Sequence, residues 1–215
     1  MVGKKNIIGW EEVVSTNSKA YNKWFTEEKK FLNKTIKKDA SVLEVGCGYG
    51  RSLFDIIAIT NNLIGIDNDK IAIKHAKIKL KKFPYIKLLV AEGKNLPFKD
   101  NSFDYVLCLS TFANFYNDKY KILGEMRRVL KNEGSMIISV YSENALKERL
   151  RVYRKINTDI KEVKPNGTVV FDDFGVDGFS EQFSKNELLK IFKKAKLKVI
   201  SIKKVTIAYI CKLSK

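Results

Sequence analysis

The sequence of 215 residues predicts an α/β protein with one mostly parallel sheet and helices on both of its faces. Three observations support this prediction. Short apolar runs alternate with helix-like segments over residues 39–141, glycines follow the first apolar run directly, and two strand-like runs lie close together near the C-terminus. Continuously apolar strands that alternate with helices are typical of a parallel sheet buried on both sides.

The elements follow in chain order. Residues 17–37 carry apolar side chains at helical spacing and predict an amphipathic helix. Strands are then expected at 41–45, 63–66, 86–90, 105–109 and 136–141, with helices at 51–59, 70–82, 116–130 and 143–156. Residues 157–183 have an irregular pattern with a turn at 165–167, and a helix is expected at 185–194.

The last two strands are expected at 198–202 and 205–212. Only Lys203 and Lys204 separate them, so they should pair as an antiparallel hairpin. The predicted fold is therefore a Rossmann-like, seven-stranded, mostly parallel sheet that ends in an antiparallel hairpin.

The length suits a single domain over residues 1–215. Within it we expect an N-terminal helical arm (1–38), a cofactor-binding core (39–141), a substrate cap inserted at about 142–183, and a C-terminal helix with the hairpin (184–215). No apolar run reaches the roughly 20 residues that span a bilayer, and the N-terminus does not resemble a signal peptide. A cytoplasmic protein without a membrane partner is expected.

Cysteine and histidine usage argues against metal chemistry. Cys47, Cys108 and Cys211 are far apart in the sequence, and His75 is the single histidine. Zinc sites and nucleophile–histidine triads need such residues in defined groups. We therefore expect no metal site, and we expect His75 on the surface of a lysine-rich helix.

The net charge of +17 raises the question of nucleic-acid binding. The basic excess is spread along the whole chain, and most of it is lysine that alternates with apolar residues in helices. Such runs are more often solvated helix faces than phosphate-binding grooves. The charge is compatible with RNA as a partner but does not require it.

The most informative segment is a strand that leads into Gly46, Gly48 and Gly50 and then into a helix. Glycines let a backbone turn sharply and approach a ligand closely. A dinucleotide fingerprint would have its third glycine at position 51, where this chain has Arg51. Asp67, at the end of the next strand, could accept both hydroxyls of a ribose. NAD remains an alternative cofactor at this point.

Four segments, residues 44–50, 65–67, 91–104 and 125–134, together resemble the class I S-adenosylmethionine-dependent methyltransferases of the methyltransferase type 11 group. The most specific is the Leu-Pro-Phe-x-Asp-x-Ser-Phe-Asp run that begins at Leu96 and leads into the fourth strand. The resemblance covers residues 40–141 strongly and the last 35 residues in general pattern.

The resemblance implies S-adenosylmethionine as cofactor and a role for each matching position. Glu44 and the glycine loop would hold the methionine part, Asp67 the ribose, Asn68 and Glu92 the adenine side, and Leu109 would offer its carbonyl to the amino group. The implied cofactor residues are Glu44, Gly46, Cys47, Gly48, Gly50, Asp67, Asn68, Glu92, Gly93 and Leu109. The family usually has aspartate at position 92 and a Lys-Pro-Gly-Gly turn at 131–134.

The methyl acceptor is less defined. Weak catalytic candidates are Asn114 in the loop after the fourth strand, Tyr141, and Asp172 in the cap. The loop around Asn114 resembles that of small-molecule N-methyltransferases, which favours an in-line transfer to a small-molecule amine. In-line transfer needs positioning above all, and a base only if the nucleophile must lose a proton.

Three alternatives stay open for the function: a tRNA methyltransferase of the wobble-uridine type, a protein methyltransferase, and a non-catalytic S-adenosylmethionine-binding partner. The sequence does not decide the oligomeric state.

Overall fold

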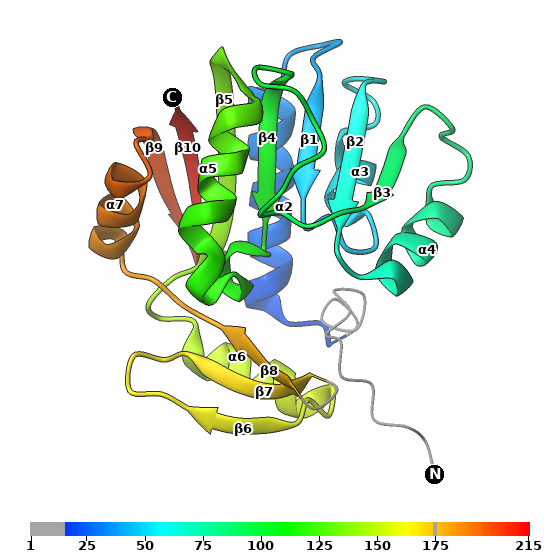
Figure 1. Cartoon of the computed structure of the whole chain (residues 1–215). Coiled ribbons are helices and arrows are strands. Elements are labelled where there is room, and N and C mark those ends of the chain that lie inside the picture. Colours follow the sequence, from blue (N-terminus) through cyan, green and yellow to red (C-terminus); the bar gives the residue numbers. More distant parts are fainter. Residues whose placement is uncertain (1–15, 174–175) are drawn as a thin grey trace.

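The computed structural model describes residues 16–173 and 176–215 and has a seven-stranded sheet at its centre (Figure 1). The strand order is β3-β2-β1-β4-β5-β10-β9. The strands are β1 (Val42–Val45), β2 (Leu63–Asp67), β3 (Lys87–Val90), β4 (Phe103–Leu109), β5 (Leu130–Tyr141), β9 (Lys198–Val205) and β10 (Ala208–Ser214). Strands β1 to β5 pair in parallel, and β10 runs antiparallel to both β5 and β9. The predicted fold class is confirmed.

Helices cover both faces of this sheet (Figure 1). They are α2 (Lys19–Thr35), α3 (Arg51–Ile56) and α4 (Lys70–Lys79) on one face, with α5 (Lys119–Val129) and α7 (Lys185–Lys194) on the other. Side chains alternate along each strand, so Val42 and Leu107 pack with α3 and α4, whereas Leu43 and Val106 pack with α5 and α7. No helix in the described part of the chain is both long and apolar enough to cross a membrane.

The N-terminal arm is tied to the core through buried charges. Glu28 on α2 is fully buried and accepts a hydrogen bond from Arg51 Nη2 at 2.6 Å. Ser139 on β5 donates to the same carboxylate, and Trp24 Nε1 donates to Ser139 Oγ at 2.9 Å. Arg51 also lies over the Phe25 ring, 4.3 Å from its centroid. Arg51, which stands where a dinucleotide fingerprint would have its third glycine, therefore anchors the arm. Residues 1–15 of the predicted arm lie outside the described residues.

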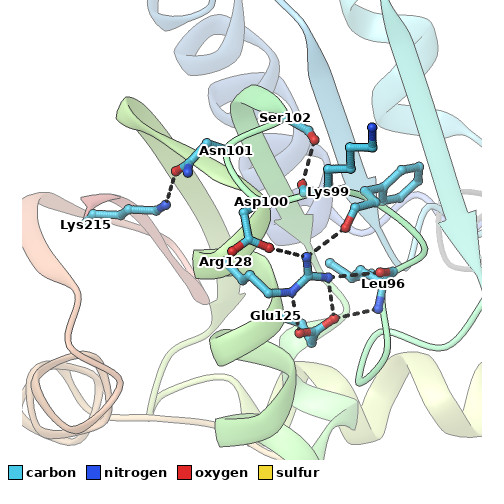
Figure 2. Close-up of polar contacts among 9 residues, drawn as sticks. Leu96, Lys99, Asp100, Asn101, Ser102, Glu125, Arg128 and Lys215 are labelled. Atoms are coloured by element: carbon cyan, nitrogen blue, oxygen red, sulfur yellow. Dashed lines mark hydrogen bonds and ion pairs between the residues drawn. The ribbon is translucent and has the colours of Figure 1, made fainter.

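The Leu-Pro-Phe-x-Asp-x-Ser-Phe-Asp run that begins at Leu96 is held against α5 by hydrogen bonds and an ion pair (Figure 2). Arg128 on α5 donates to the Glu125 carboxylate, to the Phe98 carbonyl at 2.7 Å and to Asp100 Oδ1 at 2.8 Å. The Leu96 N–H donates to Glu125 Oε2 at 2.7 Å, and Arg128 returns a bond to the Leu96 carbonyl. Two of the segments that carry the family resemblance thus bind each other and fix the connection between β3 and β4.

Several predicted boundaries are wrong. Helix α3 ends at Ile56 rather than at 59, and α4 ends at Lys79 rather than at 82. Helix α5 begins at Lys119 rather than at 116 and ends at Val129. Strand β5 begins at Leu130, and residues 131–134 loop out between the Phe103–Leu130 and Tyr105–Ser135 pairs. This bulge replaces the usual turn of the family.

The hairpin turn is also displaced. Residues 206–207 join β9 to β10, and Lys203 and Lys204 lie inside β9, opposite Ile210 and Tyr209. Both lysines form ion pairs with groups distant in sequence, Lys203 with Glu27 at 2.8 Å and Lys204 with Glu143 at 2.7 Å. These ion pairs stabilise the extended conformation at a position where polarity alone suggested a turn.

The segment 157–183, predicted as irregular, forms a small antiparallel sheet next to a helix (Figure 1). The strands of this sheet are β6 (Ile160–Val163), β7 (Val169–Asp173) and β8 (Val176–Ser180). The helix next to it is α6 (Leu146–Lys155), which precedes the segment and was expected at 143–156. The predicted turn at 165–167 is present, because Gly167 has a φ of 81° and donates its N–H to Lys164 at 2.8 Å. Four- and five-residue strands with mixed polarity give too weak a periodic signal for the sequence to reveal them.

Arg149 on α6 holds this cap together from inside. Its side chain is fully buried, and Nη1 donates to the Gly167 carbonyl at 3.0 Å while Nη2 donates to the Ser180 carbonyl. The guanidinium also lies over the Tyr141 ring, 4.7 Å from the centroid. One side chain therefore links the cap helix, the cap sheet and the end of β5.

Candidate functional site

A cleft of about 440 Å³ opens between the glycine loop and the cap sheet. It lies where β1 and β4 are neighbours and their following loops diverge, the switch point at which open α/β sheets bind ligands. Six of the predicted cofactor residues line it together: Gly46, Gly48, Asp67, Asn68, Glu92 and Gly93.

The remaining four predicted cofactor residues lie behind this lining. Glu44 is 1% exposed and accepts a hydrogen bond from Ser52. Cys47 is buried next to Gly65, and Gly50 packs against the Leu80 side chain. Leu109 is buried at the end of β4. These positions support the loop rather than form the wall of the cleft.

Two glycines of the loop are needed for different reasons. At Gly46 a Cβ would lie only 2.8 Å from the Thr111 Cβ and Oγ1, so glycine allows the loops after β1 and β4 to pack closely. At Gly48 a Cβ would meet nothing within 4 Å, and the backbone has a φ of 50°. Gly48 therefore leaves space open at the wall of the cleft and can take up the left-handed conformation.

Asp67 is held in place by the backbone. The N–H of Gly48 donates to Oδ2 at 2.8 Å, and the N–H of Asp69 donates to Oδ1 at 3.0 Å. Burial raises the pKa of the Asp67 carboxyl above its ordinary value, although these N–H donors act in the opposite direction. A carboxylate oxygen has a second lone pair, so both oxygens keep acceptor capacity toward a ligand.

The other half of the cleft is built from the loop after β4 and from the cap. Asn114, in the 3₁₀ turn Phe112–Asn114, and Tyr141, at the end of β5, both line it. Asp172 does not; it forms an ion pair with Lys161 at 2.9 Å on the cap sheet. Of the three weak catalytic candidates, two lie at the cleft.

Tyr141 belongs to a buried hydrogen-bond pair. Its hydroxyl lies 3.0 Å from that of Tyr21 on α2. Burial raises the pKa of the Tyr141 hydroxyl well above its ordinary value. The hydroxyl therefore stays protonated at neutral pH.

Sequence reasoning missed most of the cap lining. Tyr153, Phe171, Phe179 and Ser180 all face the cleft, and Tyr153 shares a hydrogen bond of 2.9 Å with Ser180. Ser110 was missed as well; it has a φ of 64°, and its buried hydroxyl has no hydrogen-bond partner. One signal in the sequence could have revealed strand β7 of the cap: the β-branched and aromatic run at 168–171, which by itself predicts a strand.

The lining is acidic although the whole chain is basic. It contains five carboxylate residues, and no lysine, arginine or histidine is among the described residues that line the cleft. The five are Asp67, Asp69, Glu92, Asp118 and Asp177. Lys94 pairs with Asp118 at 3.3 Å and Lys161 pairs with Asp177 at 2.9 Å, so the net negative charge is concentrated in the glycine-loop half.

Known proteins match the same part of the chain. A family model described as a methyltransferase domain matches residues 43–138, from β1 into β5. The uncharacterized protein MJ0638 of Methanocaldococcus jannaschii is 36% identical over 159 residues, which are 74% of this chain and 61% of that protein. The chain belongs to the S-adenosylmethionine-dependent methyltransferase family.

A second sequence relative and a solved structure are also similar to this chain. Demethylmenaquinone methyltransferase of Bacillus licheniformis is 32% identical over 136 residues, 62% of this chain and 56% of the enzyme. The crystal structure of the PH0226 protein of Pyrococcus horikoshii superimposes with a TM-score of 0.71 at 25% identity and covers 92% of both chains. The chain thus spans 56–61% of the length of the two sequence relatives and almost all of the structural one.

The cleft has features that suit S-adenosylmethionine, the cofactor of the family. The open space at Gly48 lets a ligand approach the loop, and Asp67 lies beside it with spare acceptor capacity. The cluster of carboxylates in the same half suits a cofactor that carries an amino group and a sulfonium charge. The described residues therefore fit the cofactor of the family.

Behind the glycine loop, Glu44 is an ionisable group that is buried from solvent. Burial raises the pKa of its carboxyl from 4.5 to about 8, and the Ser52 hydrogen bond only partly offsets this. Below pH 4.5 the folded and unfolded chains both bind the proton. Between pH 4.5 and 8 only the folded chain keeps it, so stability falls as pH rises through this window.

Replacing Glu44 by glutamine should remove this loss, because glutamine cannot ionise. We expect Glu44→Gln to match the wild type near pH 4.5 and to be more stable at pH 8 by up to about 4 kcal/mol, measured by thermal unfolding without ligand. Glu27→Gln serves as the control: the hydrogen bond from Lys203 lowers the pKa of Glu27 to about 2, so this variant should not gain stability at pH 8. If the stability of Glu44→Gln depended on pH in the same way as that of the wild type, the raised pKa of the Glu44 carboxyl would be contradicted.

Proposed function

We propose that this methyltransferase transfers a methyl group from S-adenosylmethionine to the amine nitrogen of a small molecule bound between the glycine loop and the cap. The observation that carries the proposal is the aromatic lining of the cap half of the cleft, with no lysine, arginine or histidine among the described residues that line it, in a protein of net charge +17. A lining without cationic side chains suits a cationic or amine ligand better than a polyphosphate backbone.

In the glycine-loop half of the cleft, each residue is proposed to contact a particular part of S-adenosylmethionine. Gly46 and Gly48 would lie against the methionine part, Asp67 would accept the ribose hydroxyls, and Asn68 with Glu92 would flank the adenine. Support comes from their common position on the cleft wall and from the fixed Asp67 carboxylate. Glu44, Cys47, Gly50, Gly93 and Leu109 complete the proposed set, with Gly93 on the wall and the other four behind it.

The sulfonium group of the bound cofactor supplies an activated methyl carbon and a neutral leaving group. The chain then has to align an acceptor nitrogen with that carbon, which is a task of positioning. Asn114 and the protonated hydroxyl of Tyr141 are proposed to orient the acceptor by hydrogen bonds. An amine that enters with a free lone pair needs no protein base before the transfer, because its proton leaves afterwards.

An aromatic ring acceptor is the second candidate, since a demethylmenaquinone methyltransferase is among the relatives. The aromatic side chains of the cap would suit such a ring as well as an amine. RNA remains a third partner to be tested, because the surface is rich in lysine. Binding to RNA through phosphate contacts would lose orders of magnitude in affinity between about 50 and 200 mM salt.

Methyl transfer from radiolabelled cofactor distinguishes these acceptors. The panel contains small primary and secondary amines, amino acids, a hydroquinone and bulk tRNA, each at about 150 mM salt. We expect turnover of at least one amine and no tRNA methylation above background. Efficient tRNA methylation at this salt, or methylation of the hydroquinone alone, would overturn the proposal in favour of the corresponding alternative.

A further inference from the structure

In the cap sheet, one aromatic ring lies directly on a glycine. Phe171 on β7 and Gly178 on β8 are paired across the strands, and both line the cleft. A Cβ built on Gly178 would overlap the Phe171 ring, with Cδ2 and Cζ both only 2.8 Å away. Real Cβ atoms do not approach other atoms this closely, so any side chain at position 178 would displace the ring.

The surroundings of this pair leave little freedom for β8 to move instead. Phe179 stacks on Tyr116 of the loop after β4, with ring centroids 4.1 Å apart and an angle of 5° between the planes. Two residues further on, Glu181 donates its N–H to the Ala113 carbonyl at 2.9 Å, and its carboxylate pairs with Lys119 at 2.7 Å. Strand β8 is thus attached to the core loop beside the pair.

Strand β7 is fixed to β8 at the next cross-strand position. Asp172 lies opposite Asp177, and Lys161 bridges the two carboxylates at 2.9 Å each. The space above the Gly178 backbone therefore determines how far the Phe171 ring extends into the cleft.

We infer that Phe171 and Gly178 form the ceiling of the acceptor site and set the size of the acceptor's apolar part. The inference deepens the proposed function and rests on it for the identity of the acceptor as an amine. Phe171 and Phe179 from the cap and Phe115 from the core loop all line the cleft. This aromatic surface fits an amine whose carbon part is compact and apolar.

The test uses protein saturated with S-adenosylhomocysteine and three amines of increasing size as probes: ethylamine, benzylamine and 2-(1-naphthyl)ethylamine. Their binding is measured by calorimetry for the wild type, Gly178→Ala, Phe171→Ala and the control Gly124→Ala. Gly124 is an exposed helical glycine whose Cβ would meet nothing within 4 Å. Thermal unfolding confirms that each variant is folded, and Phe171→Leu replaces Phe171→Ala if the latter is not.

We expect Gly178→Ala to weaken benzylamine binding at least tenfold and ethylamine binding by less than threefold. Phe171→Ala should strengthen binding of the naphthyl probe, and S-adenosylhomocysteine affinity should stay within twofold in every variant. Equal effects on all probe sizes, a parallel loss of S-adenosylhomocysteine affinity, or no amine binding to the wild type would overturn the inference. Size-dependent binding without any amine methylation would instead contradict the proposed function alone.

Discussion

Arg149→Ala is expected to lower the melting temperature by about 10 °C, the largest loss of stability predicted for a single substitution in this protein. The side chain is fully buried and donates to the carbonyls of Gly167 and Ser180 and, at 3.3 Å, to Gln182 Oε1. Its removal leaves these buried acceptors without a donor and opens a cavity under Tyr141. Such losses typically amount to about 3–5 kcal/mol.

Arg151 provides a matched control on the same helix. It is half exposed and pairs with Glu148 at 2.7 Å, three residues away. Surface pairs of this kind contribute about 0.5 kcal/mol, so Arg151→Ala should shift the melting temperature by only a degree or two. Thermal unfolding of both variants by circular dichroism measures the difference. Similar small shifts in the two variants would show that Arg149 does not hold the cap together.

Asp67→Ala is expected to weaken S-adenosylhomocysteine binding by a factor of ten to a hundred, measured by calorimetry. If Asp67 accepts both ribose hydroxyls, its loss removes two charge-assisted hydrogen bonds, and the loss of even one corresponds to roughly 1.5–3 kcal/mol. The variant also frees the N–H groups of Gly48 and Asp69 that the carboxylate now fixes. Asp67→Asn keeps one acceptor oxygen, so its affinity should lie between those of the wild type and Asp67→Ala.

Asp55→Asn is the control for charge. Asp55 lies on α3, close in sequence to the glycine loop, and pairs with Lys29 at 2.9 Å outside the cleft. This variant removes the same charge and should leave S-adenosylhomocysteine affinity unchanged. An unaltered dissociation constant in a folded Asp67→Ala variant would refute the ribose assignment.

The central sheet was predictable because its strands are continuously apolar and its glycine loop has a recognisable spacing. The glycine spacing and the family resemblance together pointed to ten cofactor positions, and six of these proposed positions lie together on the wall of the cleft. It could not distinguish Gly48, which leaves open space, from Gly46 and Gly50, which pack against Thr111 and Leu80. That distinction depends on side chains contributed by distant segments.

The cap was not predictable for a related reason. Its strands are four or five residues long, and their stability depends on Arg149 and on the fit of Phe171 over Gly178. Neither contact leaves a periodic pattern in the sequence. The hairpin turn was misplaced because Lys203 and Lys204 look like turn residues until Glu27 and Glu143 are brought next to them.

The measurement that tests the account most directly is a calorimetric titration of the wild-type protein with S-adenosylhomocysteine and, separately, with NAD. The glycine-loop half of the cleft is assigned to the methyl donor, so we expect one S-adenosylhomocysteine site per chain and at least hundredfold weaker binding of NAD. Tight NAD binding without any heat from S-adenosylhomocysteine would contradict the assignment of this cleft.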